Sequence, residues 1–270
     1  MVSPSKTSLT FTHITTATAI LNIDGVNFLT DPYFGDAGSF VADLDWSRAR
    51  LKEDFGPPVM QLHDLPPIDA VLLSHEDHYD NLDPEGRKLL DGRRVFTTMD
   101  GAKNLQPRPA VVGLKPWETV TSVIGGKEFH ITGTPCKHFP IGEVTGFLIE
   151  CDSFGTHEET GKPNAIYFSG DTVYIDELKK IKDRVHVMAA VLNLGNATFE
   201  FPIGPIQITM DGKQAVQLVQ DIGADFMVPM HFEDWEHFKE HGTDLAKIFE
   251  EAGIMHKICW PAPGVPKIVY

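Results

Sequence analysis

The sequence contains only three cysteines, Cys136, Cys151 and Cys259, among 270 residues. Three scattered cysteines are too few for a disulfide scaffold or a thiolate zinc cluster, so a reducing compartment is expected. No stretch approaches the roughly 18 apolar residues of a membrane span, and the first residues lack the charged and then apolar run of a secretory signal. These absences predict a soluble, cytoplasmic protein.

Basic residues are also scarce, because 23 Lys and Arg stand against 38 Asp and Glu, a formal net charge of -15. This charge disfavours a protein that follows nucleic-acid phosphates and one that docks on anionic lipid. We therefore expect a small-molecule substrate as the partner, and neither nucleic acid nor a membrane. The oligomeric state is left open, a homo-oligomer included.

The first part of the chain is predicted to begin with strands. Residues 8–30 alternate in strand fashion across Asp24-Gly25, which is a hairpin signal. Residues 31–67 are rich in Gly, Pro and charge, and we expect a long surface loop with one helical turn. Residues 68–73 have the near-continuous apolar pattern of a buried strand, and Asp83-Pro84 supplies an N-cap and an N1 proline for a short helix.

The rest of the chain continues the mixture, with strands predicted within 110–151, at 164–168, 185–192 and 226–229, and helices predicted over 211–221 and from an N-cap at Thr243 to Gly253. Two strand-rich parts, each with helices, favour two packed sheets flanked by helices, an α/β fold class. No linker rich in Ser, Gly or Pro interrupts the chain, and the prediction is one domain over residues 1–270.

Residues 74–83 are the most informative segment, because two histidines and several carboxylates follow a predicted buried strand. Neutral imidazole and carboxylate are the donors that a zinc-like ion takes, and a catalytic site keeps one position open for water. A solvated loop of histidines and acids is the alternative interpretation.

Three further residues of the same types follow other predicted strands. His138 comes after the strand at 129–133, Asp171 after 166–170 and His231 after 226–230. A sheet whose strands each deliver a ligand at one edge can assemble a dinuclear metal site from distant parts of the sequence.

These observations converge on a resemblance carried by five blocks, which are Thr30-Asp31-Pro32, residues 74–83, Thr134-Pro135-Cys136-Lys137-His138, Ser169-Gly170-Asp171-Thr172 and Val228-Pro229-Met230-His231. In these blocks and their order the chain resembles the metallo-β-lactamase superfamily, and within it the branch of N-acyl phosphatidylethanolamine phospholipase D and L-ascorbate-6-phosphate lactonase. The resemblance implies an αββα sandwich with two mixed β-sheets.

The pattern of that family is His-x-His-x-Asp-His, and this chain departs from it. Asn81 stands where a histidine ligand of the second metal is usual. Glu76 occupies the first histidine position, unless the loop carries one extra residue and His75 bulges back to bind. We favour His75, because imidazole is the commoner ligand.

Carried over residue by residue, the resemblance implies a first metal held by His75 or Glu76 with His78 and His138, a second held by Asp80 and His231 with weak help from Asn81, and Asp171 as a bridge. The expected cofactor is one or two Zn²⁺ ions, with Mn²⁺ or Fe²⁺ as alternatives. A metal-bound hydroxide would attack the substrate, and Asp80 would be the catalytic residue that orients it or passes on its proton.

Other side chains near these ligands are candidates for binding substrate. Tyr79 and Tyr174 could donate a hydrogen bond to a developing oxyanion, and Trp235 could wall the pocket. Structural packing is the alternative for each of the three. His237 and His241 are spaced to share one face of a predicted helix, where the alternatives are metal binding and a solvated surface.

The leading functional hypothesis is a hydrolase that opens a lactam or lactone. The acidic charge balance and the lack of an Arg and Lys cluster beside the motif blocks favour this class over phosphodiesters. A phosphodiesterase or phospholipase D-like hydrolase is one alternative. A non-catalytic metal-binding or ligand-sensing protein of the same fold is the other.

Overall fold

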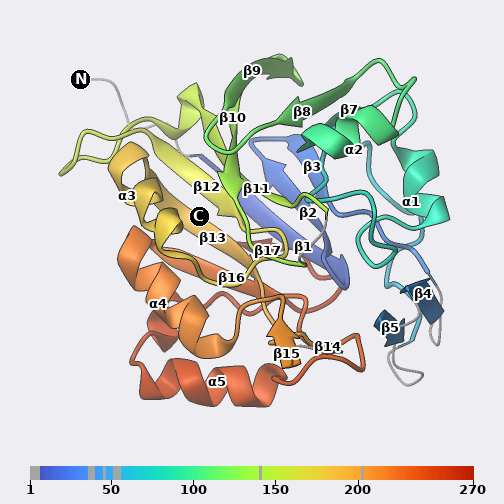
Figure 1. Ribbon diagram of the computed structural model, residues 1–270. Helices are drawn as coiled ribbons and strands as arrows, with labels where there is room; N and C mark the ends of the chain where they lie inside the picture. The colour runs from blue at the N-terminus through green and yellow to red at the C-terminus, as the bar shows by residue number, and fades with distance from the viewer. Residues whose placement is uncertain (1–6, 36–39, 45–46, 51–55, 140–141, 202–203) are drawn as a thin grey trace.

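The computed structural model describes residues 7–35, 40–44, 47–50, 56–139, 142–201 and 204–270, without the side chains of 40–44, 47–50 and 201. Within these residues the chain forms two large sheets, two short hairpins and five α-helices (Figure 1). The hairpins are β4 (Phe40–Leu44) with β5 (Ser47–Arg50) and β14 (Thr198–Phe201) with β15 (Gly204–Gln207).

The first sheet contains seven strands, which are β1 (Leu9–Thr15), β2 (Thr18–Ile23), β3 (Val26–Thr30), β6 (Ala70–Leu72), β7 (Arg94–Thr98), β8 (Val111–Leu114) and β17 (Lys267–Ile268). Their order is β17-β1-β2-β3-β6-β7-β8. Strands β1 to β3 are antiparallel, and β3, β6, β7 and β8 run parallel. Asp24 and Gly25 both have positive φ, at 49° and 88°, as a two-residue hairpin turn between β2 and β3 requires.

The second sheet contains six strands, which are β9 (Thr119–Ile124), β10 (Lys127–Pro135), β11 (Thr145–Cys151), β12 (Asn164–Phe168), β13 (His186–Asn193) and β16 (Phe226–Met230). Their order is β16-β13-β12-β11-β10-β9. The strands β9 to β12 are antiparallel, whereas β12, β13 and β16 are parallel. The parallel strands are buried along nearly their whole length, which explains their continuous apolar sequences.

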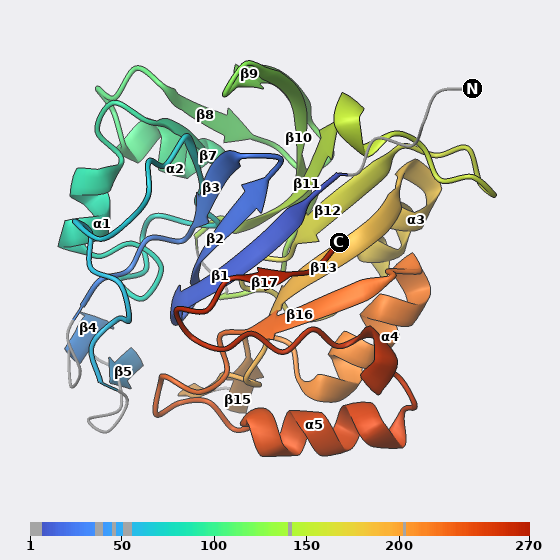
Figure 2. The same cartoon turned by 180° about the vertical axis from the view of Figure 1, so that it is seen from behind.

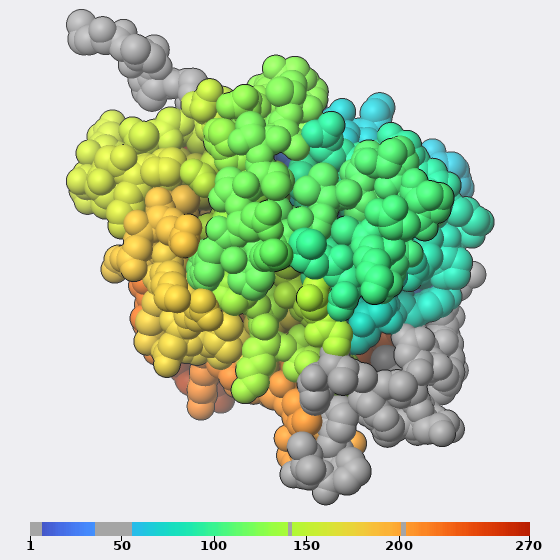
Figure 3. Space-filling view, turned by 45° about the horizontal axis from the view of Figure 1, so that its top comes forward, coloured from blue at the N-terminus to red at the C-terminus, as the bar shows by residue number. Residues whose placement is uncertain are grey.

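The α-helices are α1 (Pro84–Leu89), α2 (Met99–Asn104), α3 (Ile181–Arg184), α4 (Gly212–Ile222) and α5 (Gly242–Glu251). Figures 1 and 2 show α1 and α2 beside the first sheet and α3, α4 and α5 beside the second. In the space-filling view, the green segment with β9 and β10 runs between the teal helices and the yellow segment that leads to α3 (Figure 3). Among the described helices, none is long and apolar enough to cross a membrane.

Three apolar layers hold the sandwich together. Between the sheets, Phe28 of β3 meets Phe129 of β10 edge to face, with ring centroids 5.0 Å apart. Leu218 belongs to a second layer, between α4, α5 and the second sheet, and Leu89 to a third, between α1 and the first sheet. This order of helix, sheet, sheet and helix is the αββα sandwich that the sequence predicts.

Several element predictions were wrong in detail. The predicted loop 31–67 contains the hairpin β4–β5, and its described residues include a hydrogen-bonded turn at 62–64 but no helix. Helix α5 begins after His241, two residues before the predicted cap, because the Asp244 carboxylate accepts a hydrogen bond from the His241 backbone N–H at 3.1 Å. Helix α2 was not predicted, since its six residues are too few to show a helical period.

Candidate metal centre

The candidate ligands come together because strand ends meet at one edge of the two sheets. His75 follows β6, His138 follows β10, Asp171 follows β12 and His231 follows β16 directly. His231 has φ 59°, in the left-handed region that few residues other than glycine adopt, so the backbone turns sharply where β16 ends. Such a turn aims a side chain across the sheet edge instead of along the strand.

The first group of candidate ligands consists of three histidines. One ring nitrogen each from His75, His78 and His138 lies within 4.8 Å of the others. His75 Nε2 is 2.9 Å from His78 Nδ1, and His138 Nε2 is 3.3 Å from the same atom. Ligands held at about 2.0–2.1 Å around a tetrahedral ion would be roughly 3.3 Å apart, so the three nitrogens fit one shared cation.

The outer nitrogens of two of these rings are fixed by hydrogen bonds. His75 Nδ1 lies 2.8 Å from the Ser74 hydroxyl oxygen, and His138 Nδ1 lies 2.8 Å from the carbonyl oxygen of Ile208. In both rings Nε2 is thereby left to face the group. Metal-binding histidines are oriented in this way by partners on their other nitrogen.

The second group consists of Asp80, Asp171 and His231, whose ligand atoms also lie within 4.8 Å of one another. His231 Nε2 is 3.6 Å from Asp171 Oδ2, and the Asn193 amide donates to Asp171 Oδ1 at 2.7 Å. Asp171 and His231 are buried, whereas Asp80 is partly exposed. Two carboxylates and an imidazole form an acceptable donor set for a second divalent ion.

The surroundings set the protonation states that metal binding requires. Burial lowers the pKa of His75, His78 and His138, so their imidazoles are neutral. Burial alone would raise the pKa of Asp171, but the adjacent His231 outweighs it and holds this pKa well below its usual range. Burial alone would lower the pKa of His231, but the paired Asp171 carboxylate raises it to about 9, so a cation bound there must displace a proton from this ring. The three neutral imidazoles and the ionised Asp171 are already in the forms that bind a cation, and the donors present therefore fit a metal centre.

Residues 74–83, which we name the metal loop, are tied to the first sheet by Asp31. Its carboxylate accepts hydrogen bonds from the Ser74 N–H at 2.6 Å, the Ser74 hydroxyl at 2.8 Å and the Asn81 amide at 3.1 Å. Burial, with Asp171 nearby, raises the pKa of Asp31 to about 8. The sequence predicted no role for this residue, although its place in the Thr-Asp-Pro block was a signal.

The structure separates the two alternatives for the first ligand. The Glu76 carboxylate forms an ion pair with Arg87 at 2.8 Å and accepts a hydrogen bond from the Asn104 amide at 2.8 Å. Both carboxylate oxygens are thus engaged outside the two ligand groups, and Glu76 joins neither group. His75 is the residue that joins His78 and His138.

Asn81 lies in the metal loop beside Asp31 and is completely buried. Its amide nitrogen donates to Asp31, while its Oδ1 is buried and has no hydrogen-bond partner. The amide oxygen is therefore the only donor atom that Asn81 could offer to a metal ion. Amide oxygen is a weak donor for zinc compared with imidazole.

The three predicted substrate-binding residues have different surroundings. Tyr79, within the metal loop, is partly exposed and packs edge to face on Tyr33, with centroids 6.1 Å apart. Tyr174 does not join the site, because its hydroxyl donates to Asp221 of α4 at 2.6 Å. Trp235 is fully buried, and its ring contacts Tyr33 edge to face and stacks with His237.

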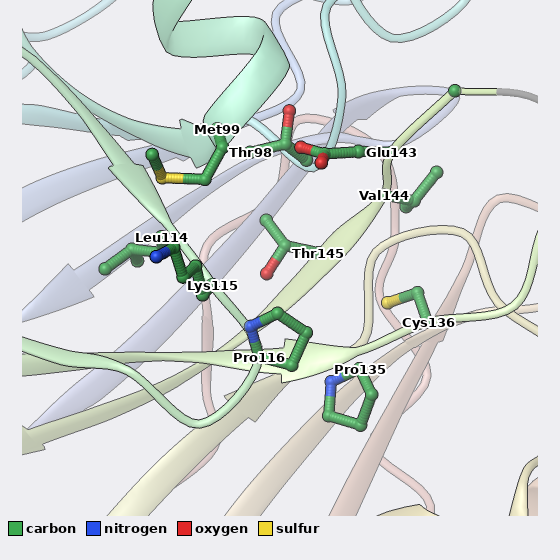
Figure 4. Close-up of a pocket in the computed structure, with 11 residues that line it drawn as sticks. Thr98, Met99, Leu114, Lys115, Pro116, Pro135, Cys136, Glu143, Val144 and Thr145 are labelled. Atoms are coloured by element: carbon green, nitrogen blue, oxygen red, sulfur yellow. The ribbon is translucent and has the colours of Figure 1, made fainter.

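A separate cavity of about 270 Å³ lies near the start of α2. Figure 4 shows Thr98, Lys115, Cys136 and Glu143 among the side chains around it. None of the six candidate ligands lines this cavity. Burial raises the pKa of the Cys136 thiol, which favours its protonated form over the thiolate.

Comparison with known proteins decides the family. A model of the beta-lactamase superfamily domain matches residues 26–232. The chain belongs to this superfamily. The matched region contains all six candidate ligands.

Curated relatives in this superfamily differ in length from the chain. N-acyl-phosphatidylethanolamine-hydrolyzing phospholipase D 1 of Caenorhabditis elegans is 30% identical over 202 residues, which are 67% of this chain and 52% of the relative. An uncharacterized protein of Mycobacterium tuberculosis is 28% identical over 268 residues, 92% of this chain and 65% of the relative. A UPF0173 metal-dependent hydrolase of Exiguobacterium is 26% identical over 250 residues, 88% of this chain and 92% of the relative. The chain thus spans between 52% and 65% of the length of the first two relatives.

Solved structures show the same fold. An isothiocyanate hydrolase from Delia radicum gut bacteria superimposes with a TM-score of 0.76 at 23% identity, covering 96% of this chain and 98% of that one. The metallo hydrolase Igni18 of Ignicoccus hospitalis gives a TM-score of 0.71 at 20% identity, covering 97% and 98%. At these identities the likeness establishes the fold alone.

Proposed function

We propose that the protein is a metal-dependent hydrolase of a small molecule, with its metal centre formed by the two ligand groups. The observation that carries the proposal is that three neutral imidazoles and a second set of two carboxylates and an imidazole each gather within 4.8 Å. Membership of the beta-lactamase superfamily and the likeness to a metal-dependent hydrolase support it.

A bound divalent ion would supply Lewis acidity that polarises the substrate and makes a water molecule nucleophilic near neutral pH. The protein residues position the reacting groups and move the proton. Asp171 and His231, both buried, hold position, whereas Asp80 is partly exposed and can reach both solvent and substrate. We propose Asp80 as the catalytic carboxylate that orients the water and passes its proton to the leaving group.

We further propose that the scissile bond belongs to a cyclic ester or amide. The five motif blocks that supply the candidate ligands contain a single lysine or arginine side chain, Lys137, which is exposed. An uncharged carbonyl compound needs no cationic side chain, whereas a phosphodiester is usually gripped by one. The net charge of -15 supports the same choice.

A phosphodiesterase is the second candidate, because the Caenorhabditis elegans relative, at 30% identity, is named a phospholipase D. A substrate panel separates the two candidates. We expect turnover of the six-membered lactones dihydrocoumarin and δ-valerolactone or of the β-lactam nitrocefin, and none of bis(4-nitrophenyl) phosphate. Turnover of the phosphodiester alone would overturn the choice of bond.

The metal centre itself is tested by elemental analysis of purified variants. His138→Ala and Asp171→Asn should each reduce bound metal at least severalfold, because each removes a donor. His130→Ala is the matched control, since His130 lies on β10, the strand that precedes His138, and contacts the Thr121 hydroxyl at 2.9 Å. Unchanged metal in both variants would show that the site is misassigned, and metal binding with no turnover of any substrate would favour a non-catalytic ligand-binding protein.

The same analysis identifies the ion. Imidazole and carboxylate donors suit Zn²⁺, Mn²⁺ and Fe²⁺ alike, and we propose Zn²⁺ as the first choice for a hydrolase. A neighbour in fold, CmlA of Streptomyces venezuelae, is a diiron β-hydroxylase, with a TM-score of 0.63 at 13% identity. Iron in place of zinc would therefore revise the cofactor and leave the ligand assignment intact.

A further inference from the structure

A chain of aromatic rings leads away from the first ligand group. The ring of Phe139 lies edge to face against His138, with centroids 5.1 Å apart. Phe139 in turn contacts Phe199 of β14 at 5.4 Å, and Phe199 contacts His237 at 4.8 Å. Phe139 and His237 are partly exposed, whereas Phe199 is buried and packs between them, so the surface next to the ligands comes from the two partly exposed rings.

The chain of rings returns to the second ligand group. His237 contacts Phe238 at 4.9 Å, and Phe238 lies edge to face against His231, also at 4.9 Å. We name Phe139, Phe199, His237 and Phe238 the aromatic arc. It runs from a ligand of one group to a ligand of the other, so it borders both groups.

Two buried nitrogen atoms beside the arc lack hydrogen-bond partners. They are His237 Nδ1 and Trp235 Nε1, and their rings stack at 6.1 Å. Burial, and then His231, lower the pKa of His237 to about 3, which keeps its imidazole neutral and able to donate one hydrogen bond. The indole N–H is a donor only, and the His237 ring, in the tautomer that carries its proton on Nδ1, also needs an acceptor such as an oxygen.

The predicted helix through His237 and His241 was wrong, and this explains why sequence spacing missed the arc. The described residues 231–240 form no helix, and the His241 ring lies 3.0 Å from the carbonyl oxygen of Phe232. His237 and His241 therefore do not share one face of a helix. His237 faces aromatic residues from β14 and from its own loop.

We propose that the aromatic arc binds a flat aromatic ring fused to the scissile cyclic ester, with His237 donating a hydrogen bond to an oxygen atom of that substrate. This inference rests on the proposed function and names its substrate class. For an aryl lactone such as dihydrocoumarin, water adds across the ester C–O bond. The ring oxygen leaves as a phenol that takes up one proton, and the product is 3-(2-hydroxyphenyl)propanoate.

The test compares dihydrocoumarin with δ-valerolactone, which has the same lactone ring without the fused benzene. Stacking on the arc favours the aromatic lactone, so Phe139→Leu and Phe199→Leu should lower the ratio of the two kcat/KM values by about threefold to tenfold. The control is Phe226→Leu, at a partly buried ring that packs on Tyr270. Bound metal should be unchanged in every variant.

His237→Phe keeps a ring and removes the hydrogen bond. We expect KM for dihydrocoumarin to rise about threefold to tenfold with kcat little changed, and KM for δ-valerolactone to change less. A KM effect of equal size on both lactones, or a loss of kcat and bound metal together, contradicts a role in recognising the aromatic substrate.

Binding of 3-(2-hydroxyphenyl)propanoate, measured by calorimetry, keeps the inference separate from the proposed function. Tight binding that weakens in Phe199→Leu, with no lactone turnover by the unchanged protein, would support the arc and overturn the proposed reaction. Turnover of both lactones with a ratio that no arc variant alters would overturn the arc alone. A crystal structure with the product in which only water contacts His237 Nδ1 would also overturn it.

Discussion

Asp31 is the residue on which the metal loop depends, although it belongs to neither ligand group. It follows β3 with φ 29°, a left-handed conformation that is unfavourable for aspartate. Three hydrogen bonds to its carboxylate, two from Ser74 and one from Asn81, offset the cost of this conformation. The Ser74 hydroxyl also contacts His75 Nδ1, so Asp31 acts on the first ligand through Ser74.

Asp31→Ala should lower the free energy of unfolding by about 2–4 kcal/mol, because buried donors on Ser74 and Asn81 lose their acceptor. The same change should reduce bound metal. Asp69→Ala is the control, since Asp69 accepts one hydrogen bond, from the Asn27 N–H at 2.8 Å, at the other end of β6. Denaturant unfolding with elemental analysis gives both quantities, and a variant of Asp31 with normal metal content would refute the link.

His75 and Glu76 provide a second test at this scale. His75→Ala should lower the metal content, because an imidazole of the first group is lost, whereas Glu76→Gln should retain it. Glu76→Gln should instead cost less than about 1 kcal/mol of stability, since its partner Arg87 is partly exposed. Loss of metal in Glu76→Gln with retention in His75→Ala would reverse our assignment.

At the scale of secondary-structure elements, the site depends on how closely strand ends approach one another. Gly170, just after β12, has φ 56°, and an added Cβ would lie 2.7 Å from both Ser74 Cβ and the Thr145 carbonyl oxygen. Only glycine permits such a close approach of the backbone to Ser74 and Thr145, and the approach packs the segment that carries Asp171 against the metal loop. The approach therefore couples the second sheet to the first at the candidate centre.

Gly170→Ala should destabilise the protein by more than the roughly 1 kcal/mol that a left-handed alanine costs, because backbone and Ser74 must also move. Gly161→Ala separates the two effects, since Gly161 has φ 67° and nothing within 4 Å of an added Cβ. We expect normal metal content in Gly161→Ala and reduced content in Gly170→Ala. Equal unfolding free energies for the two variants would argue against the close approach.

At the scale of the whole molecule, the candidate metal centre joins the two sheets. His75 and Asp80 follow β6 of the first sheet, whereas His138, Asp171 and His231 follow strands of the second. Each ligand group takes residues from both sheets. An ion bound there would cross-link the sandwich at the edge where its two halves meet.

Removal of metal by a chelator should therefore lower the thermal unfolding midpoint. Saturation at about 100 times the dissociation constant adds about 2.7 kcal/mol, and each 1 kcal/mol shifts Tm by about 2–4 °C in a chain near this size. We expect a fall of about 5–10 °C, measured by calorimetry and restored by added Zn²⁺. His138→Ala should show little response to the chelator, and a full response in that variant would place the stabilising ion elsewhere.

Much of this architecture follows from local sequence signals. Continuous apolar runs such as 164–168 and 185–192 predict buried strands, and the Asp211 cap followed by a left-handed Gly223 bounds α4 as its sequence requires. The β4–β5 hairpin and α2 were missed, because neither has enough residues for a periodic pattern to emerge. Short elements depend on packing, which a single sequence does not display.

The sequence by itself determined the types of donor and their places after predicted strands, because residue chemistry and strand length are local properties. It also determined the family, through motif blocks in order along the chain. Only the tertiary structure placed His75, and not Glu76, beside His78 and His138, since the partners that hold Glu76 elsewhere, Arg87 and Asn104, lie 11 and 28 residues away in the sequence. The aromatic arc likewise exists only when the segments around residues 139, 199 and 237 meet, because contacts between distant residues form when the whole chain packs.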